Sequence, residues 1–364
     1  MTPFSSSLAP VTDLATLARR WRALESRVGG PFFLSWTWIS AWVAGLDSPP
    51  LLLSVMDADG RDIALGLFVE TIERRRGLRV RQVRLHDTGL AQRDAITVEY
   101  NSLLCEAGSE AAAWYSALRA LRGQGGWDEI IVSGATDRTA GLLDGLGLSM
   151  HRRAETSSAY VDLSALRAQG VGDADGYLAS LGKNTRQQVR RSMRLYAERG
   201  PLALEPCSDV EGFFADLGEH HEAKWRAVGA TGATVNAEYM RFQRRMIADA
   251  LPRGEVELLR ASAGGEGFGW LYNFVWRGRV LFYLSGFRAE EDNRLKPGLV
   301  THALAVERHL HGDATTYDFM GGANRYKTSL GQPGPDMVSV ALQRRVPVLM
   351  LEDIARKVKN RLGR

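Results

Sequence analysis

The sequence predicts an α/β fold in which mixed central sheets are flanked by helices, and it predicts this arrangement twice. Residues 267–331 read as two strands, a helix and a third strand, an order that sets two strands parallel with the helix as their crossover. Residues 51–148 follow the same order, which indicates an internal duplication with a degenerate first copy. At 364 residues the chain is long enough for two hydrophobic cores.

Composition is that of an ordinary folded protein and excludes several classes. The formal net charge of +4 permits an anionic ligand without requiring nucleic acid. No run approaches the roughly 18–20 apolar residues of a membrane helix, and the N-terminus lacks the pattern of a signal peptide. Cys105 and Cys207 are too few and too distant for a disulfide framework or a metal cluster. We therefore expect a cytoplasmic protein without a metal.

Hydrophobic periodicity predicts the elements of the first half in order. Residues 13–28 place apolar side chains on one helical face, and after Pro31 a second helical stripe runs to Gly45. Asp59-Gly60 is a hairpin turn between two apolar runs. Strands are predicted at 51–56, 63–72, 80–85 and 127–132, and helices at 112–121 and 141–148.

The chain is expected to divide near residue 168. Residues 167–176, which are rich in Gly, Ala and Asp, read as the junction between the two copies. We therefore assign residues 1–168 to a degenerate N-terminal domain and residues 169–364 to a C-terminal domain that carries the chemistry.

The C-terminal copy contains a helix that begins directly after a polar loop. Arg277-Gly278 marks the hairpin between two strands rich in aromatic and β-branched residues. Lys296-Pro297-Gly298 ends the loop, and proline suits the first helical turn because its missing N–H costs nothing there. Backbone N–H groups converge at a helix N-terminus and attract phosphate or another anion.

Four blocks of the sequence resemble one known family. A short strand is predicted at 315–319, and the first block lies around it: Tyr317-Asp318-Phe319, Gly322 and Tyr326-Lys327. The second block is Tyr283 to Phe287 together with Pro297-Gly298-Leu299. The other two are KNTRQQVRR at 183–191 and PFFLSWTWISAW at 31–42. These blocks resemble the GNAT acyltransferases, in the branch associated with cellulose and exopolysaccharide operons and related to the Fem-type aminoacyltransferases. The resemblance implies tandem GNAT-like domains and acyl-CoA as the donor.

The chemistry of acyl transfer selects five residues of the C-terminal copy. Transfer from a thioester to an amine needs a deprotonated amine, a polarised carbonyl and a proton for the departing thiolate. Backbone N–H groups at Ser285-Gly286 would polarise the carbonyl. The resemblance implies Tyr326 as the residue that protonates the thiolate. Asp318 or His221 would accept the amine proton, directly or through water.

Each catalytic assignment has a structural alternative. Asp318 either takes part in proton transfer or hydrogen-bonds the turn at Gly321-Gly322. Tyr326 is either the acid or a core tyrosine. His221 lies on a predicted helix where the related acyltransferases often carry a histidine or tyrosine. The second histidine that a zinc HExxH motif requires is absent at the necessary spacing, so zinc is not expected there.

Basic residues are the candidate contacts for the donor. Lys296 and Gly298 lie at the predicted helix N-terminus, and Lys327 offers a point charge for a phosphate or carboxylate. A second set forms one positive stripe along a predicted helix: Lys183, Arg186, Arg190 and Arg194. This stripe either binds phosphates of the donor or acceptor, or is a solvated face paired with carboxylates such as Glu205 or Glu211.

The sequence therefore predicts an N-acyltransferase that moves an acyl group, in the first instance acetyl, from acyl-CoA to a primary amine of an amino sugar, an amino acid or a related small molecule. A Fem-type transferase that takes aminoacyl-tRNA is one alternative, and the arginine stripe favours it. A non-catalytic module that binds phosphorylated sugars or nucleotides is the other. Apart from tRNA under the first alternative, no nucleic-acid partner, membrane span or metal is expected.

Overall fold

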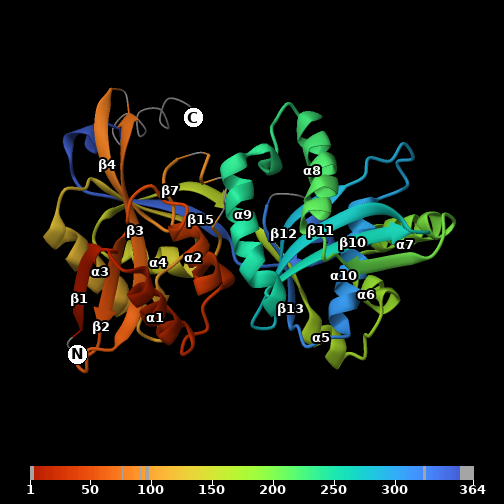
Figure 1. The fold of residues 1–364 in the computed structure, drawn as a ribbon, viewed down its shortest axis with the longest axis horizontal. Helices are drawn as coiled ribbons and strands as arrows, with labels where there is room; N and C mark the ends of the chain where they lie inside the picture. Colours follow the sequence, from red (N-terminus) through yellow and green to blue (C-terminus); the bar gives the residue numbers. More distant parts are fainter. Residues whose placement is uncertain (1–3, 76, 91, 95–97, 323–324, 353–364) are drawn as a thin grey trace. The chain divides into compact units, whose positions relative to one another are not determined.

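The computed structural model describes residues 4–75, 77–90, 92–94, 98–322 and 325–352 (Figure 1). The chain divides into two compact units, Met1–Glu155 with Asp336–Arg364, and Thr156–Pro335. Each unit contains one β-sheet in which a parallel strand pair lies beside antiparallel pairs, and helices pack on both sheets. The predicted α/β class, with two mixed sheets flanked by helices, is confirmed.

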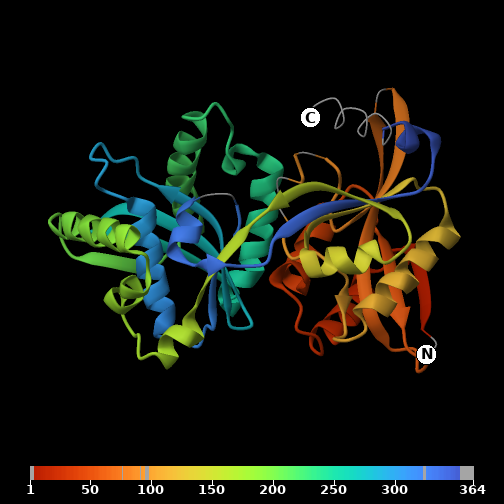
Figure 2. The ribbon, with the colours of Figure 1, turned by 180° about the vertical axis from the view of Figure 1, so that it is seen from behind.

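The sheet of the first unit has the strand order β1-β2-β3-β4-β6-β15-β7, with β5 paired to β3. Its strands are β1 (Ser5–Pro10), β2 (Leu51–Met56), β3 (Asp62–Arg75), β4 (Leu78–Leu85), β5 (Leu104–Cys105), β6 (Glu129–Thr136), β7 (Ser149–Thr156) and β15 (Met337–Gln343). Its helices are α1 (Leu14–Glu25), α2 (Trp36–Val43), α3 (Glu110–Gln124) and α4 (Asp137–Asp144). Helices α1 and α2 lie on one face of this sheet, and α3 and α4 on the other (Figure 1 and Figure 2).

The sheet of the second unit has the strand order β14-β8-β13-β12-β11-β10-β9. Its strands are β8 (Ser158–Asp162), β9 (Leu202–Pro206), β10 (Val256–Ala263), β11 (Glu266–Trp276), β12 (Arg279–Phe287), β13 (Thr316–Gly321) and β14 (Gln332–Pro333). Its helices are α5 (Leu163–Ala168), α6 (Ala174–Ser180), α7 (Lys183–Ala197), α8 (Val210–Arg226), α9 (Ala237–Ala250), α10 (Pro297–Leu310) and α11 (Arg325–Leu330).

Helices α8 and α10 pack on opposite faces of this second sheet. A Cβ atom added at Gly286 of β12 would meet Leu217 of α8, whereas one added at Gly269 of β11 would meet Thr301 of α10. Gly286 pairs with Trp270, the residue that follows Gly269 on β11. Successive side chains of a strand point to opposite faces of the sheet, so the two glycines face opposite sides. The absence of a side chain at each position therefore lets a helix approach the sheet closely on both sides.

The predicted elements of the C-terminal copy are present. The hairpin turn contains Gly278 in the left-handed conformation, and the helix begins at Pro297 as its N1 or N2 residue. In the first copy, the helix predicted at 141–148 begins and ends earlier along the chain. The reason is a cap that the apolar pattern does not show, because the Thr136 side chain accepts a hydrogen bond from the Thr139 N–H.

The boundaries of the two units differ from the expected division into 1–168 and 169–364. Strand β8 and helix α5 belong to the second unit, since β8 pairs with β13 through contacts such as Val161 with Tyr317. Strand β15 returns to the first unit, where it pairs with β6. The apolar pattern of a strand shows that it is covered but does not show which sheet it joins.

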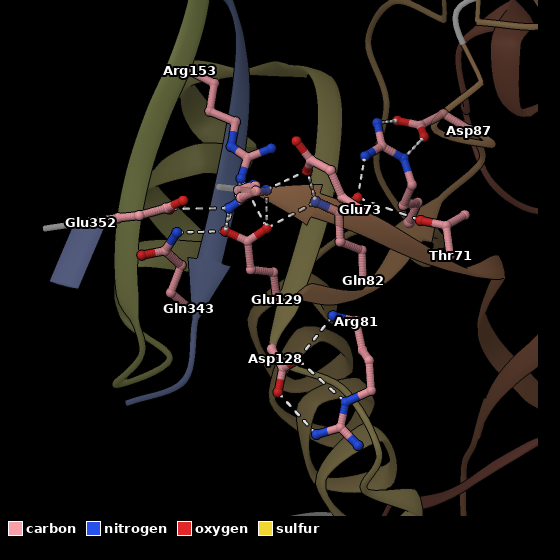
Figure 3. Close-up of polar contacts among 12 residues, drawn as sticks. Thr71, Glu73, Arg81, Gln82, Asp87, Asp128, Glu129, Arg153, Gln343 and Glu352 are labelled. Carbon is pink, nitrogen blue, oxygen red and sulfur yellow. Dashed lines mark hydrogen bonds and ion pairs between the residues drawn. The ribbon is translucent and has the colours of Figure 1, made fainter. Parts of the chain in front are cut away.

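A buried polar network crosses the first sheet (Figure 3). Glu129 of β6 is 0% exposed. Its carboxylate oxygens accept hydrogen bonds from Arg75 at 2.9 and 2.6 Å and from Arg153 at 2.8 and 2.9 Å. Gln82 and Gln343 also donate to it. Burial alone would raise the pKa of Glu129, but the hydrogen bonds and the arginine charges outweigh it and lower this pKa to about 2.

Replacing Glu129 with Gln should lower the free energy of unfolding by about 3 kcal/mol or more at neutral pH, because the two arginines lose a buried charge partner. The folded-state pKa lies below the unfolded value of ~4.3. The carboxylate therefore stabilises the fold above that pH, and this contribution is lost as the pH falls towards 2. Urea unfolding should show the wild type and the variant converging between pH 5 and pH 2.

The pair between the exposed guanidinium of Arg81 and the buried Asp128, drawn in the same view, is the control (Figure 3). Arg81 is 53% exposed as a side chain, so Arg81→Gln should change the free energy of unfolding by less than about 1 kcal/mol. A difference between wild type and Glu129→Gln that stays constant with pH would show that the charge of Glu129 does not stabilise the fold.

Candidate active site

Two neighbouring strands of the second sheet separate partway along their length. β12 and β13 pair in parallel only where Arg279–Leu281 meets Thr316–Asp318, although every residue of both strands is described. Beyond these pairs, residues 282–287 of β12 and 319–321 of β13 run without pairing to each other. We call these two stretches the strand fork. Open strand edges present N–H and C=O groups to which an extended ligand can bind.

The corresponding parallel pair of the first sheet is closed at that end. β4 and β6 pair from Gln82 with Glu129 as far as Leu85 with Val132, and Leu85 is the last residue of β4. The two units therefore differ at the position where the second unit has its fork. This difference makes the second unit the candidate for ligand binding.

His221 of α8 contacts β12 within the fork. Its Nδ1–H donates to the carbonyl oxygen of Ser285 at 3.0 Å, and the N–H of Ala233 approaches Nε2 at 3.4 Å. The ladder with β11 shifts by one residue at Tyr283, which is a β-bulge beside this contact. Burial lowers the pKa of His221, so its imidazole is neutral at pH 7. The predicted residues His221 and Ser285 are thus in direct contact.

Gly286 explains how α8 comes close enough for this contact. A Cβ atom at this position would lie 2.8 Å from Cα of Leu217 and closer still to its carbonyl oxygen. Real Cβ atoms do not approach backbone this closely, so any other residue would push α8 away from β12. Gly286 is a predicted site residue because of its backbone N–H, and the structure adds this steric role.

Asp318 lies at the end of the paired part of β13. Its side chain is 1% exposed and accepts hydrogen bonds from Arg279 Nη2 at 2.7 Å and from the N–H of Met320 at 2.8 Å. Met320 has a φ of 58°, a conformation that costs energy for a residue other than glycine. Asp318 therefore stabilises a strained turn at Met320. This turn lies one residue before Gly321-Gly322, the turn that Asp318 was predicted to hydrogen-bond if its role is structural. Its part in proton transfer stays a prediction.

Tyr326 of α11 stacks on a histidine that the sequence analysis did not select. The rings of Tyr326 and His302 lie 5.7 Å apart at an angle of 20°. Burial raises the pKa of the Tyr326 hydroxyl above its usual range, so the hydroxyl keeps its proton at neutral and moderately alkaline pH. A tyrosine in this state can act as a proton donor. Tyr326 is also partly buried, which agrees with the alternative that it is a core tyrosine.

His302 lies on the buried face of α10 between the two diverging strands. Its ring contacts Phe282 and Phe287 of β12 and Phe319 of β13. Nδ1 lies 3.0 Å from the hydroxyl of Tyr317, and within the described residues Nε2 is buried without a hydrogen-bond partner. Burial and then the charge of Lys327 lower the pKa of His302 to about 3. Its position on the apolar stripe of the predicted helix is also that of a core residue, so no signal in the sequence identified it.

Lys327 lies inside the fork rather than on the surface. It is 6% exposed, and its Nζ donates to the carbonyl oxygens of Gly321 at 2.5 Å and Met320 at 3.5 Å. The same ammonium lies 5.7 Å from the ring centroid of Phe282. Lys327 was predicted to be a point charge that binds a phosphate or carboxylate, whereas its ammonium is held between the end of β13 and β12.

The N-terminus of α10 is fixed to α7. The N–H of Lys296 donates to the hydroxyl of Ser192 at 2.8 Å. Gly298 lies against the ring of Phe287, which an added Cβ would approach to 3.1 Å. Lys296 and Gly298 are therefore placed beside the end of β12, at the open end of the fork.

The predicted basic stripe lies on α7, but its contacts differ from those expected. Arg190 pairs with Asp175 at 3.1 Å, and Arg186 donates to the carbonyl oxygen of Ala179 at 3.0 Å. Asp175 is therefore the carboxylate partner of Arg190, in place of the two glutamates that the sequence suggested. Lys183 is exposed at the start of the helix. Both arginine contacts fit a paired surface, and phosphate binding by the stripe stays a prediction.

A pocket of about 340 Å³ lies beside α11 in the second unit. Its lining combines two tyrosines with hydroxyl and amide side chains: Tyr160, Tyr177, Gln169, Ser180, Thr328, Ser329 and Gln332. The hydroxyl of Tyr177 donates to the carbonyl oxygen of Leu330 at 2.6 Å, which ties α6 to the end of α11. Helix α11 thus contributes Tyr326 and Lys327 to the fork and Thr328 and Ser329 to this pocket.

The described part of the chain contains neither a metal-binding group of side chains nor a membrane-spanning helix. Among these residues, no group of three or more His, Cys, Asp or Glu side chains is placed to hold a metal ion. None of the helices that the structure describes is both long and apolar enough to cross a bilayer.

Comparisons with known proteins concern the domain family and the fold. Residues 183–328 match the family model of an acetyltransferase (GNAT) domain. No curated protein matches the sequence. Among solved structures, the chain is similar to FemX, with 11% identity over 92% of this chain and 97% of that one and a TM-score of 0.58. It is also similar to L-PGS from Bacillus licheniformis, with 12% identity over 94% of this chain and 96% of that one and a TM-score of 0.54.

The matched region contains the whole fork and every predicted site residue. The prediction of a GNAT-type transferase is confirmed for this part of the chain. The structural similarities, at such low identity, show the fold alone. The link to cellulose and exopolysaccharide operons stays a prediction.

Proposed function

We propose that the second unit is an N-acyltransferase that moves an acyl group, in the first instance acetyl, from acyl-CoA to the primary amine of a small molecule. The strand fork carries this proposal. Within a region that matches a GNAT domain, it combines an open edge of β12, a half-buried protonated tyrosine and a neutral histidine.

The donor would bind along the open edge of β12. The N–H groups beside Ser285 and Gly286 would polarise the acyl carbonyl, while His221 already holds the Ser285 carbonyl oxygen in place. The pyrophosphate would lie at the N-terminus of α10, near Lys296 and Gly298, where helical N–H groups attract anions. Exposed Lys183, together with Arg186 and Arg190 of α7, would then contact only outer parts of the donor or acceptor.

The proposed chemistry uses one acid and one base. The amine nitrogen attacks the thioester carbonyl carbon, the carbon–sulfur bond breaks, and the thiolate takes the proton of Tyr326. His221 takes the amine proton, directly or through water, because its lowered pKa leaves it unprotonated at pH 7. Asp318 is the weaker candidate for the base, since its carboxylate already pairs with Arg279.

The acceptor class and compartment are part of the same proposal. An amino sugar or amino acid fits the hydroxyl and amide groups that line the pocket beside α11. Both cysteines are free thiols, which fits a reducing compartment such as the cytoplasm. A role in polysaccharide biosynthesis would follow if the acceptor is an amino sugar.

A Fem-type transferase that takes aminoacyl-tRNA is the second candidate. The observation that favours it is the exposed basic surface of α7, where Lys183, Arg190 and Arg194 all face solvent. The similarity to FemX adds a shared fold and does not identify the donor.

Release of free thiol from acetyl-CoA tests the proposed function. We expect thiol release that depends on an added amine, measured over a panel of amino sugars, amino acids and polyamines, and acetylated product by mass spectrometry. Saturating donor binding without amine-dependent release in any member of a broad panel would favour a binding module. A product formed only with aminoacyl-tRNA would favour the second candidate.

Replacing Gly298 with Asp should weaken donor binding by more than tenfold, or more than ~1.4 kcal/mol. The new carboxylate would lie among N–H groups that are proposed to hold the donor pyrophosphate, while an acidic residue in a first helical turn does not weaken the helix. Calorimetric titration of CoA measures the effect. Gly298→Asn is the matched control, since it has the same contact with Phe287 without the charge. Equal affinity of the two variants would remove the pyrophosphate from this position.

A further inference from the structure

We propose that the pocket beside α11 is an ammonium-binding site, so that the acceptor of the second unit is a polyamine or another diamine, with one protonated and one reacting amine. This inference rests on the proposed function, because it takes the pocket as the place of the acceptor. It narrows the acceptor from primary amines in general to molecules that carry a second, cationic amine.

The first observation is the charge of the pocket, which has a volume of about 340 Å³. Among the residues that line it, Asp162 at the end of β8 is the single one with a charged side chain. Its Oδ1 accepts a hydrogen bond from the N–H of Ala165 at 2.8 Å, and within the described residues no cation pairs with this carboxylate. An ionised carboxylate has lone pairs for several donors, so part of its capacity remains for a ligand.

The basic residues that are close to the lining in the sequence make other contacts. Arg167 donates to three backbone carbonyl oxygens at and after the end of α10, and Arg186 donates to that of Ala179. Lys183 is exposed at the start of α7. Asp162 is half-buried, and solvent screens such a charge less than a fully exposed one. The pocket therefore favours a cationic ligand.

The second observation is the direction of the hydroxyl hydrogen bonds. Tyr177, Ser180 and Ser329 line the pocket, and each hydroxyl donates its proton to a backbone carbonyl oxygen. The acceptors are the oxygens of Leu330 at 2.6 Å, Tyr177 at 2.7 Å and Tyr326 at 2.8 Å. With their protons used in this way, the three hydroxyls can only accept from a ligand. An ammonium group, which has three donors and no acceptor, matches them.

The third observation is an aromatic ring on the same strand as the carboxylate. Tyr160 lies two residues before Asp162 on β8, so the two side chains share one face of the strand. Both residues are half-buried, and both line the pocket. The face of an aromatic ring attracts a cation, and a carboxylate beside it adds a charged acceptor. This pair suits an ammonium group better than a neutral or anionic one.

The position of Asp162 shows that the amine it holds is not the one that reacts. Ser158, at the other end of β8, pairs with Gly321, the fork residue whose carbonyl oxygen accepts from Lys327. Asp162 lies further along β8 by about 13 Å, at about 3.3 Å per residue. An amine held there stays protonated and away from the fork. The nucleophile must therefore be a second amine, at the other end of a chain.

Three amines with the same chain provide the test: octamethylenediamine, nonylamine and ω-aminononanoate. They differ only in the group at the far end, which is an ammonium, a methyl or a carboxylate group. With acetyl-CoA as the donor, we expect kcat/KM for the diamine to exceed that for each of the other two by at least tenfold. Asp162→Asn should reduce this preference severalfold through the KM of the diamine, with kcat nearly unchanged. Asparagine caps a helix as well as aspartate does, so α5 keeps its cap.

Asp173→Asn is the matched control. Asp173 caps α6 by accepting from the N–H of Gly176 at 2.7 Å, and it does not line the pocket. This variant should keep the preference of the wild type. Calorimetric titration of octamethylenediamine without a donor measures the site independently of turnover. We expect the affinity to fall at least tenfold in Asp162→Asn and to stay unchanged in Asp173→Asn.

The outcomes separate this inference from the proposed function. If wild type acetylates all three amines equally well, the ammonium site is overturned while acyl transfer stands. If the diamine binds through Asp162 but no amine is acetylated, the site stands and the proposed function fails. A preference that persists undiminished in folded Asp162→Asn overturns the role of Asp162. If circular dichroism shows that this variant does not fold, Asp162→Ser, which also caps a helix, is judged by the same criterion.

Discussion

Tyr326→Phe should lower turnover by about 10²–10⁴-fold, the range typical of a lost general acid. The substitution keeps the ring and its stacking on His302 and removes only the hydroxyl. Donor affinity should stay close to wild type, because the thiolate develops only after the donor has bound. The raised pKa of Tyr326 places the alkaline limit of activity above the usual range of a tyrosine, and this limit should shift or vanish in the variant.

Tyr177→Phe is the matched control for Tyr326→Phe. Its hydroxyl is also buried in the second unit, but it donates to the carbonyl oxygen of Leu330 and has a structural role. This control should lose about 1–3 kcal/mol of stability, with turnover per folded molecule close to wild type. If Tyr326→Phe behaves in the same way as the control, Tyr326 is a core residue and has no part in the mechanism. Turnover and melting are measured on the same preparations.

Gly286→Ala should damage both stability and activity. The new methyl group would be forced against the backbone of Leu217, so α8 must move away from β12. Overpacking of this kind costs about 1–3 kcal/mol, and the shift also separates His221 from the Ser285 carbonyl oxygen. We therefore expect a lower unfolding midpoint and a fall in kcat/KM of tenfold or more.

Gly218→Ala is the control for Gly286→Ala, because Gly218 lies on α8 next to Leu217. An added methyl group there makes an ordinary 3.5 Å contact with Thr234, and alanine favours the helix by about 1 kcal/mol over glycine. This variant should be as stable as wild type or more so. A Gly286→Ala protein with wild-type stability and activity would show that the close approach of α8 is not required.

Local chemistry explains why much of the second sheet could be predicted. Gly278 in a two-residue turn and Pro297 at a helix start are signals that act through their immediate neighbours. The places of β8 and β15 could not be predicted in the same way. Each joins a sheet through strands distant in the sequence, and its own pattern of apolar residues is compatible with either sheet.

The candidate site, too, could be predicted from the sequence only in part. Sequence placed Tyr326, Lys327 and His221 in one domain, and the structure shows that His221 contacts β12 and that Lys327 is buried between β12 and β13. That burial could not be read from the sequence, because it follows from tertiary contacts of α11 with the end of β13. His302 was missed because a histidine on an apolar helical stripe is hard to distinguish from a core residue.

Hydrogen–deuterium exchange with and without acetyl-CoA tests most directly whether the strand fork holds the donor. The open edge of β12 and the first turn of α10 should become protected when the donor binds, since their N–H groups would then be bonded to it. Peptides that cover β4 and β6 of the first unit should be unchanged. Saturating donor binding without protection at residues 282–300, or with protection confined to the first unit, would contradict this assignment.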